Sequence, residues 1–219
     1  MSWETPELPE IQRRYRWVAP IYPLFNIVFG LPPGIRKKAV ERLGLLAGGS
    51  VLEVGCGTGR NFPLLANAVG PEGHIFGVDA TREMLERAEL LAKRRKIPNV
   101  TLRLEDAAEL TLDKTVDAAL FSLSYSVIPG EKDALAKAWA LVRPGGRLVI
   151  MDASVERRHS GRLLRRSAAA LSRATVLGNP FKKGWEDLKA LAGDVEVQDF
   201  GRGLYFIATA SKAGRQASP

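Results

Sequence analysis

Short apolar runs rich in β-branched residues alternate along this chain with amphipathic stretches of helical length. A run that is apolar on both faces is typical of a strand covered by helices on each side, and intervening helices let successive strands run parallel. The pattern therefore predicts an α/β protein with a parallel sheet and helices on both faces. The predicted strands are 50–54, 75–79, 100–104, 116–123 and 147–152, and the predicted helices are 60–69, 81–96 and 131–142.

The pattern changes at its end, where β-rich runs at 195–200 and 204–210 follow each other directly. Only Gly201, Arg202 and Gly203 connect them, and so short a connection permits an antiparallel hairpin but no parallel crossover. A parallel sheet that ends in a hairpin differs from the repeated half of an ordinary dinucleotide-binding protein.

The length of 219 residues fits one domain of generous size, or a core with a small appendage. With 46% apolar and 26% charged residues, the composition excludes collagen-like, low-complexity and wholly disordered classes. We expect residues 1–47, which are Pro-rich with basic helical pieces, to form a helical cap over the active site. Residues 48–211 should form the main domain, with a basic helical insertion at 156–192, and residues 212–219 a disordered tail.

The sequence predicts a cytoplasmic protein. Its longest apolar stretch, 21–35, is too short to span a bilayer and is broken by Pro23, Pro32 and Pro33. The N-terminal residues lack the apolar segment of a secretory signal. The single cysteine, Cys56, cannot form an internal disulfide, which suits a reducing compartment.

A glycine-rich loop follows the first predicted strand, with Gly55, Gly57 and Gly59 on alternate positions. Glycines there let the chain turn tightly and let a ligand touch the backbone at the carboxyl edge of the sheet, although a tight turn alone would also use them. A nicotinamide-dinucleotide loop would need its third glycine at Arg60, and a P-loop would need Gly-Lys-Ser/Thr. Neither kind of site is therefore predicted.

Three carboxylates accompany this loop. Glu53 would repel a diphosphate but attract an ammonium group. Asp79 ends the second strand and can accept hydrogen bonds from both hydroxyls of a ribose, and Asp106 follows the third strand and can accept one from an adenine amino group. Asp79 and Asp106 could instead cap helices. Together the three predict an adenosine with a cationic tail that lacks phosphate, which is S-adenosylmethionine (SAM).

The successive motifs resemble those of class I SAM-dependent methyltransferases over residues 48–210. They are Glu53-x-Gly55-x-Gly57-x-Gly59, Asp79 followed by Met84-Leu85, Asp106-Ala107, and Leu141 to Gly146. The resemblance implies a Rossmann-like enzyme with a mostly parallel seven-stranded sheet in the order 3-2-1-4-5-7-6 and strand 7 antiparallel. It also implies SAM as cofactor, held by Glu53, Gly55, Cys56, Gly57, Gly59, Asp79, Ala80, Met84, Asp106, Ala107 and Ser122.

Two further resemblances concern the methyl acceptor. Residues 123–129 are similar to the corresponding segment of betaine-lipid and bacterial phospholipid N-methyltransferases. Residues 18–26 are similar to the start of ubiquinone and menaquinone C-methyltransferases, except that Pro23 replaces their usual Asp. Both families act on amphiphiles, so we expect a lipid or other amphiphilic acceptor, with methylation of a lipid headgroup amine of the phosphatidylethanolamine or betaine-lipid type. Quinone-type C-methylation and RNA methylation are the alternatives.

The candidate substrate-contacting residues are Tyr15, Tyr22 and Tyr125. Their hydroxyls could orient a headgroup, and their rings could hold a methylated ammonium by cation–π attraction, although aromatic packing on the core would also explain them. The sequence indicates no dedicated general base, and an amine acceptor could lose its proton to water. His74 and His159 are isolated and no metal-ligand spacing occurs, so no metal is predicted.

The net charge of +8 is concentrated between residues 156 and 183, which hold eight Lys and Arg against one Glu. Drawn as a helix, residues 162–177 place one basic face beside an apolar one. We expect this segment to contact an anionic membrane or a phosphate-bearing substrate, with a solvated face or nucleic acid as alternatives and no stable nucleic-acid partner. The arginines concerned are Arg162, Arg165, Arg166 and Arg173.

Overall fold

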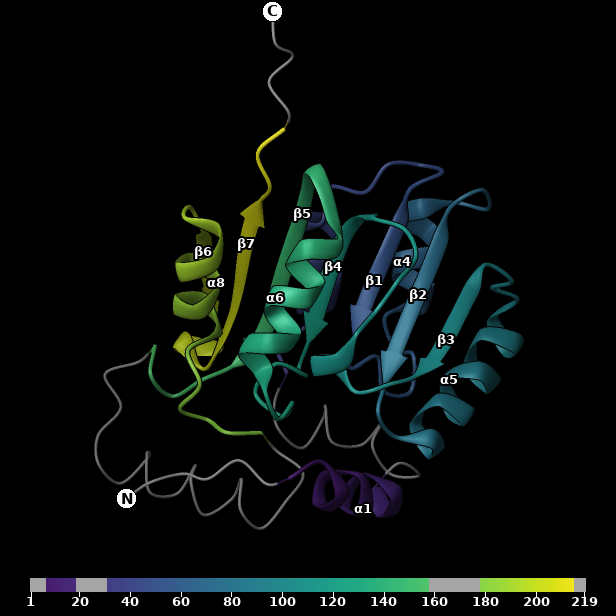
Figure 1. The fold of residues 1–219 in the computed structure, drawn as a ribbon, viewed down its shortest axis with the longest axis horizontal. Helices are drawn as coiled ribbons and strands as arrows, with labels where there is room; N and C mark the ends of the chain where they lie inside the picture. The colour runs from purple at the N-terminus through teal and green to yellow at the C-terminus, as the bar shows by residue number, and fades with distance from the viewer. Residues whose placement is uncertain (1–6, 19–30, 158–177, 215–219) are drawn as a thin grey trace, which may run out of the picture.

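The computed structural model describes residues 7–18, 31–157 and 178–214. Its centre is a seven-stranded sheet in the order β3-β2-β1-β4-β5-β7-β6 (Figure 1). The pairs among β1 to β5 are parallel, and β7 is antiparallel to both β5 and β6, which confirms the predicted fold class, strand order and terminal hairpin. The strands are β1 (Ser50–Val54), β2 (His74–Asp79), β3 (Val100–Leu104), β4 (Val116–Ser122), β5 (Val142–Ala153), β6 (Glu196–Phe200) and β7 (Tyr205–Ser211).

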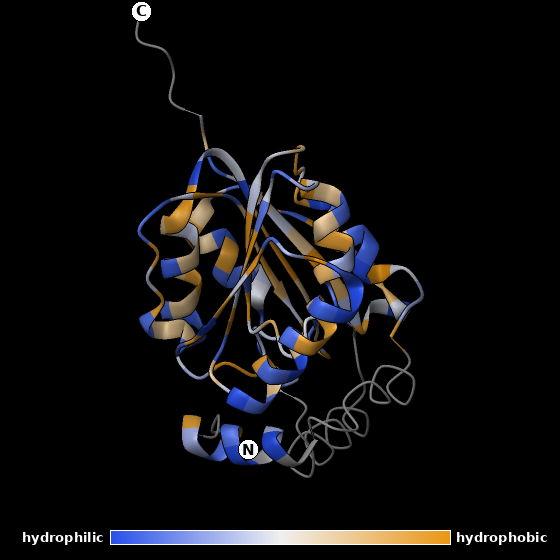
Figure 2. Cartoon of the chain, turned by 90° about the vertical axis from the view of Figure 1, so that its right-hand side faces the viewer, coloured by the Kyte–Doolittle hydropathy of each residue, from blue (hydrophilic) through white to orange (hydrophobic). Residues whose placement is uncertain are grey.

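Helices cover both faces of this sheet (Figure 2). The α-helices are α1 (Leu8–Val18), α3 (Ile35–Arg42), α4 (Phe62–Val69), α5 (Arg82–Arg95), α6 (Glu131–Leu141) and α8 (Gly184–Ala192), with 3-10 turns η1 (Ala107–Glu109) and η2 (Gly201–Gly203). Side chains alternate across β1, so that Val51 packs with α3, α4 and α5 whereas Leu52 packs with α6 and α8. Both faces are therefore apolar, as the continuous apolar runs of the sequence indicate.

The two helices before β1 occupy different places. Ile35, Ala39 and Leu43 of α3 are buried in the core on one face of the sheet, so α3 is a layer of the fold rather than part of a cap. By contrast, α1 lies at the carboxyl edge of the strands (Figure 1). There Gln12 Nε2 donates a hydrogen bond of 2.8 Å to the Ala80 carbonyl. Among the described residues before β1, α1 alone lies where the cap is expected, and the division at residue 47 stays a prediction.

Most boundaries differ from the sequence-based expectation by one or two residues, and two differences change how a segment is interpreted. β5 begins at Val142 rather than at residue 147, because Val142 already pairs with Val116 before an irregularity in the β4–β5 register. Lys212 belongs to the ordered fold and not to a disordered tail. Its Nζ lies 2.7 Å from the carbonyls of Trp139 and Val142 at the end of α6, where an ammonium satisfies carbonyls that the helix leaves without partners.

Part of the predicted insertion at 156–192 is described. Within it, α8 buries Leu188 against the sheet. Residues 158–177 lie outside the described residues, and with them the proposed basic helix and its four arginines, Arg162, Arg165, Arg166 and Arg173. In the described ranges, no helix is both long and apolar enough to cross a bilayer.

Candidate functional site

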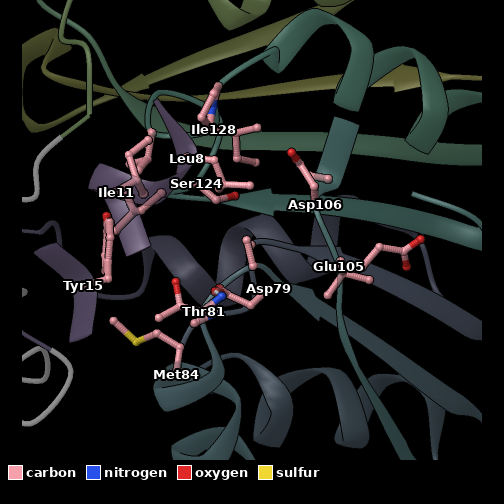
Figure 3. A pocket seen from close by; sticks show the side chains of 18 residues that line it. Leu8, Ile11, Tyr15, Asp79, Thr81, Met84, Glu105, Asp106, Ser124 and Ile128 are labelled. Carbon is pink, nitrogen blue, oxygen red and sulfur yellow. Dashed lines mark hydrogen bonds between the residues drawn. The ribbon is translucent and has the colours of Figure 1, made fainter. Parts of the chain in front are cut away.

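A cavity opens at the carboxyl edge of β1, β2 and β4, and α1 borders it (Figure 3). One side, called here the polar side, comes from the loops after β1, β2 and β3. The opposite side, called here the apolar side, comes from residues 123–129 after β4 and from α1. The polar side contains Gly55, Gly57, Val78, Asp79, Ala80, Thr81, Met84, Glu105, Asp106 and Ala107, and the apolar side contains Leu8, Ile11, Tyr15, Leu123, Ser124, Val127, Ile128 and Pro129.

The glycine loop borders the cavity through Gly55 and Gly57, which have φ angles of +68° and +55°. A Cβ atom at Gly55 would lie 2.5 Å from the Cβ of Ser124, so both conformation and packing require glycine there. A Cβ at Gly57 would meet nothing within 4 Å. The backbone at Gly57 is therefore open to a ligand. Cys56 and Gly59, which the sequence also assigns to the cofactor, are not part of the described cavity wall. Cys56 is buried, and Gly59 packs against Phe62.

Asp79 joins the glycine loop to the end of β2. Its Oδ2 accepts a hydrogen bond from Gly57 N at 2.8 Å, and its Oδ1 accepts one from Thr81 N at 2.9 Å. Burial raises the pKa of Asp79, and these two bonds oppose that rise. Each carboxylate oxygen has a second lone pair, so the side chain can also accept hydrogen bonds from a ribose. Its position on the cavity wall is compatible with the predicted role.

Asp106 lies farther along the polar side. It is the N-cap of η1, where its Oδ1 accepts a hydrogen bond from Ala108 N at 3.0 Å. The helix-cap interpretation therefore applies, and the residue borders the cavity as well. Ala80, Met84 and Ala107, which the sequence also assigns to the cofactor, stand in the same wall.

Glu53 belongs to β1 just before the glycine loop; it is not part of the described cavity wall, and it is only 1% exposed. Its Oε1 accepts a hydrogen bond from Asn61 Nδ2 at 2.5 Å, whereas Oε2 is buried without a hydrogen-bond partner in the described part of the chain. Burial raises the pKa of Glu53 to about 7, against the hydrogen bond from Asn61 and the nearby charge of Arg36. A buried acceptor without a hydrogen bond, such as Glu53 Oε2, lowers the stability of the fold. A donor such as a ligand ammonium would satisfy it.

Arg36 of α3 connects two more residues of this region. Its Nη1 donates to Asn61 Oδ1 at 3.2 Å and to Ser122 Oγ at 3.0 Å. Ser122 is buried and does not border the cavity in the described wall, so its assignment to the cofactor stays a prediction. Sequence reasoning did not identify Arg36 or Asn61. The only available signal was the position of Asn61 at the start of the helix after the glycine loop.

The structure places two of the three candidate tyrosines, one at the cavity and one in the core. Tyr15 shares one face of α1 with Leu8 and Ile11 and borders the cavity. Tyr125 is 1% exposed, and its hydroxyl donates to Asp187 Oδ2 at 2.9 Å while its ring meets Phe121 edge-on. Burial also raises its pKa. This position in the core does not support a substrate contact for Tyr125. Tyr22 lies outside the described residues.

The apolar side contains residues that the sequence did not single out individually. Leu8 and Ile11 come from α1, and Val127, Ile128 and Pro129 follow β4. The sequence located the second group only as a segment that selects the acceptor. Across the ranges that the structure describes, no group of three or more His, Cys, Asp or Glu side chains is arranged to hold a metal ion.

A family model described as a methyltransferase domain matches residues 45–196. Among similar sequences, a demethylmenaquinone methyltransferase of Geobacillus sp. (strain WCH70) is 31% identical over 120 residues, which cover 54% of this chain and 51% of that protein. One from Listeria innocua is 29% identical over 154 residues, covering 69% and 65%. An uncharacterized 37.1 kDa protein in a Streptomyces fradiae transposon is 36% identical over 116 residues, covering 52% and 33%. The matches thus span less than two thirds of these relatives.

Solved structures share the fold at lower identity. A SAM-dependent methyltransferase from Aquifex aeolicus superposes with a TM-score of 0.62 at 22% identity, covering 82% of this chain and 93% of that one. A complex of DhpI with S-adenosylhomocysteine (SAH) gives a TM-score of 0.67 at 20% identity, covering 94% and 96%. At these identities the likeness is one of fold.

Proposed function

The chain belongs to the class I SAM-dependent methyltransferases, and from this premise we propose that it methylates an amphiphilic small molecule. The observation that carries the proposal is the contrast across the cavity. The carboxylates Asp79, Glu105 and Asp106 lie on the polar side, whereas Leu8, Ile11, Val127, Ile128 and Pro129 present hydrocarbon from the apolar side. An acceptor with an apolar body would bury that body there, because removal of apolar surface from water is favourable.

The polar side fits the cofactor. Gly57 leaves room for a ligand at the backbone, and Glu53 has a buried oxygen that needs a donor. Asp79 would hold the ribose hydroxyls, Asp106 the adenine amino group and Glu53 the ammonium of the methionine portion. When bound, SAM supplies a methyl group that its sulfonium charge makes electrophilic. The chain's own contribution is to orient the acceptor and to exclude water, which α1 supports by covering the carboxyl edge.

The first candidate acceptor is a lipid headgroup amine. Tyr15 on the cavity wall supports it, since an aromatic face attracts a methylated ammonium by about 0.5–2 kcal/mol. An amine that has lost its proton to water needs no base from the protein. The second candidate is a quinol methylated at carbon, which the names of the demethylmenaquinone methyltransferase relatives favour.

Methyl-labelled SAM distinguishes these acceptors. The protein is incubated in parallel with phosphatidylethanolamine vesicles, with demethylmenaquinone bearing a short prenyl chain, and with total RNA. Asp79→Ala, which should bind SAM more weakly, serves as the low-activity control. We expect label in one of the two amphiphiles, as an N-methylated lipid for the first candidate or a C-methylated quinone for the second. Label in RNA alone would overturn the proposal.

We also propose that residues 156–183 bind anionic membranes, on the basis of their sequence charge. Each arginine near such a surface contributes on the order of 1 kcal/mol, so replacing all four arginines at 162, 165, 166 and 173 by glutamine should lower affinity by roughly two to three powers of ten. Flotation with anionic and neutral vesicles at low and high salt measures this. If the parent protein does not float with anionic vesicles at low salt, the proposed membrane contact is wrong.

A further inference from the structure

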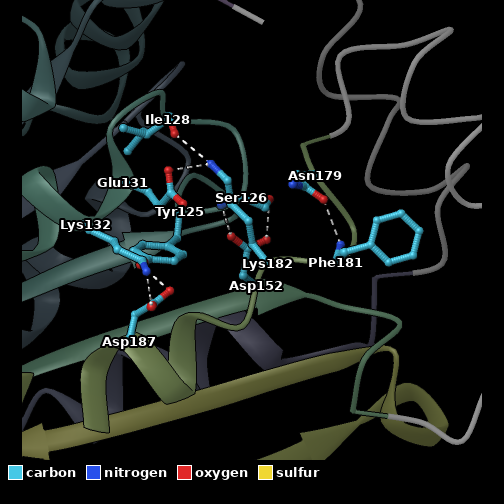
Figure 4. Close-up of polar contacts among 10 residues, drawn as sticks. All are labelled: Tyr125, Ser126, Ile128, Glu131, Lys132, Asp152, Asn179, Phe181, Lys182 and Asp187. Carbon is cyan, nitrogen blue, oxygen red and sulfur yellow. Dashed lines mark hydrogen bonds and ion pairs between the residues drawn. The ribbon is translucent and has the colours of Figure 1, made fainter. Parts of the chain in front are cut away.

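A buried lysine lies behind the apolar side of the cavity. Lys182 precedes α8, and its side chain is 7% exposed. Its Nζ donates to the Ile128 carbonyl at 2.8 Å and lies 3.0 Å from Glu131 Oε2 (Figure 4). Ile128 itself borders the cavity. One ammonium thus connects the cavity wall, the start of α6 and the segment before α8.

The same loop is held at a second point. Ser126 donates from its backbone N and its Oγ to the two oxygens of Asp152, at 2.8 and 3.1 Å, and Asp152 is 3% exposed. The Ser126 carbonyl accepts a hydrogen bond from Asn179 N at 2.9 Å. Residues 179–182 therefore contact the loop at both Ser126 and Ile128, and none of them borders the cavity in the described wall.

Lys182 supplies positive charge to three surrounding carboxylates, those of Glu131, Asp152 and Asp187. Burial lowers the pKa of Lys182, and Glu131, Asp152 and Asp187 oppose that change. Lys132, which pairs with Asp187 at 3.4 Å, is largely exposed. Without Lys182, the carboxylates of Glu131 and Asp152 would lose a buried counter-charge and the Ile128 carbonyl would lose its donor. Both losses are costly in a desolvated environment.

We propose that Lys182 is a positioning residue for the methyl acceptor. It fixes Ile128 and Pro129 in the apolar wall and touches neither acceptor nor cofactor. This inference rests on the proposed function for its effect on the acceptor. Its effect on the loop is independent of which acceptor is used.

Lys182→Met removes the charge and retains most of the hydrocarbon, and Lys183→Met is the matched control, because Lys183 is exposed and pairs with Glu186. With phosphatidylethanolamine or demethylmenaquinone as acceptor, we expect Lys182→Met to raise the acceptor KM tenfold or more with kcat within threefold. Calorimetry should give a SAM dissociation constant within twofold of the parent. Lys182→Arg should recover much of the KM, and Lys183→Met should change nothing. An unchanged KM in Lys182→Met overturns the proposal.

Hydrogen exchange separates this inference from the proposed function. In the protein saturated with SAH, Lys182→Met should speed exchange of the Val127 and Ile128 amides, which donate to the Ser124 carbonyl, whereas Lys183→Met should not. If the parent methylates neither amphiphile, the proposed function fails but exchange still decides the role of Lys182. Should Lys182→Met not fold, Glu131→Gln provides the same two measurements with a milder change, and unchanged exchange and KM in it overturn the inference.

Discussion

The polar and apolar sides of the cavity are held in place by different means. On the polar side, Asp79 bonds to Gly57 and Thr81, which lie 22 and 2 residues away in sequence. On the apolar side, Ile128 is held by Lys182, 54 residues away. The first arrangement uses backbone amides next to the strand ends, and the second uses a buried charged cluster. Substitutions should therefore separate cofactor binding from acceptor binding.

The largest expected effect concerns Glu53, which lies in β1 just before the glycine loop and outside the described cavity wall. Its pKa in the folded protein is about 7, above the usual 4.5, so the folded state binds this proton more tightly than the unfolded chain. The stability that Glu53 contributes is full below pH 4.5 and is lost as the pH rises to about 7. Relative to Glu53→Gln, the free energy of unfolding of the ligand-free parent should fall by about 3 kcal/mol across that window. Urea unfolding at several pH values measures it, and a constant difference would contradict the buried, proton-binding carboxyl.

Asp79→Ala should weaken SAM binding by about 1.5–3 kcal/mol, or roughly 10-fold to 150-fold, because a charged acceptor of the ribose is lost. Titration calorimetry measures the affinity. Asp113→Ala is the control, since Asp113 is exposed and is not part of the described cavity wall. Undiminished affinity in Asp79→Ala would remove this residue from the ribose contact.

Tyr125→Phe tests whether the ring belongs to the core or to the acceptor site. Removing its hydrogen bond to Asp187 should cost about 1–2 kcal/mol of unfolding free energy and leave the acceptor KM within twofold. Chemical denaturation and steady-state kinetics give the two values. A tenfold rise in KM at unchanged stability would return Tyr125 to the role predicted from the sequence.

The smallest effect compares two residues with left-handed backbone, Leu123 at φ +56° and Lys96 at φ +54°. Lys96 is an exposed C-cap, so Lys96→Gly should stabilise the fold by about 0.5–1 kcal/mol. Leu123→Gly relieves the same backbone strain but removes a side chain that packs on the core and borders the cavity. Thermal unfolding should show a gain only for Lys96→Gly, and equal gains would mean that the Leu123 side chain contributes no packing.

Several residues of the polar side could be named from the sequence because their signals are local, while their contacts with the cofactor stay predictions. A strand, a glycine loop and an acid after the next strand identify Gly57, Asp79 and Asp106 without knowledge of distant contacts. The contacts of Arg36 with Asn61 and Ser122 could not be predicted from such local signals. Arg36 reaches Ser122 across 86 residues, and its basic neighbours in the sequence give it no distinguishing pattern.

The apolar side was predicted only as a segment. From the sequence, an aromatic residue after β4 is compatible with either the core or the cavity. In the structure Tyr125 is in the core, where its hydroxyl donates to Asp187, a residue 62 positions away. Lys182 looks like one of several basic residues in a positively charged stretch. Carboxylates from β5, α6 and α8 compensate its buried charge. Because these three elements are far apart in the sequence, no residue spacing within one segment predicts that they meet at Lys182.

The position of β7 between β5 and β6 has a consequence for synthesis on the ribosome. Until residues 205–211 have left the exit tunnel, β5 has an open edge and β6 has no strand beside it. The nascent chain thus carries an apolar strand edge, with Val149 and Met151 among its residues, that can pair with other chains. Ribosome-stalled chains that end before residue 205 should accordingly recruit chaperones, and chains that expose residue 211 should release them.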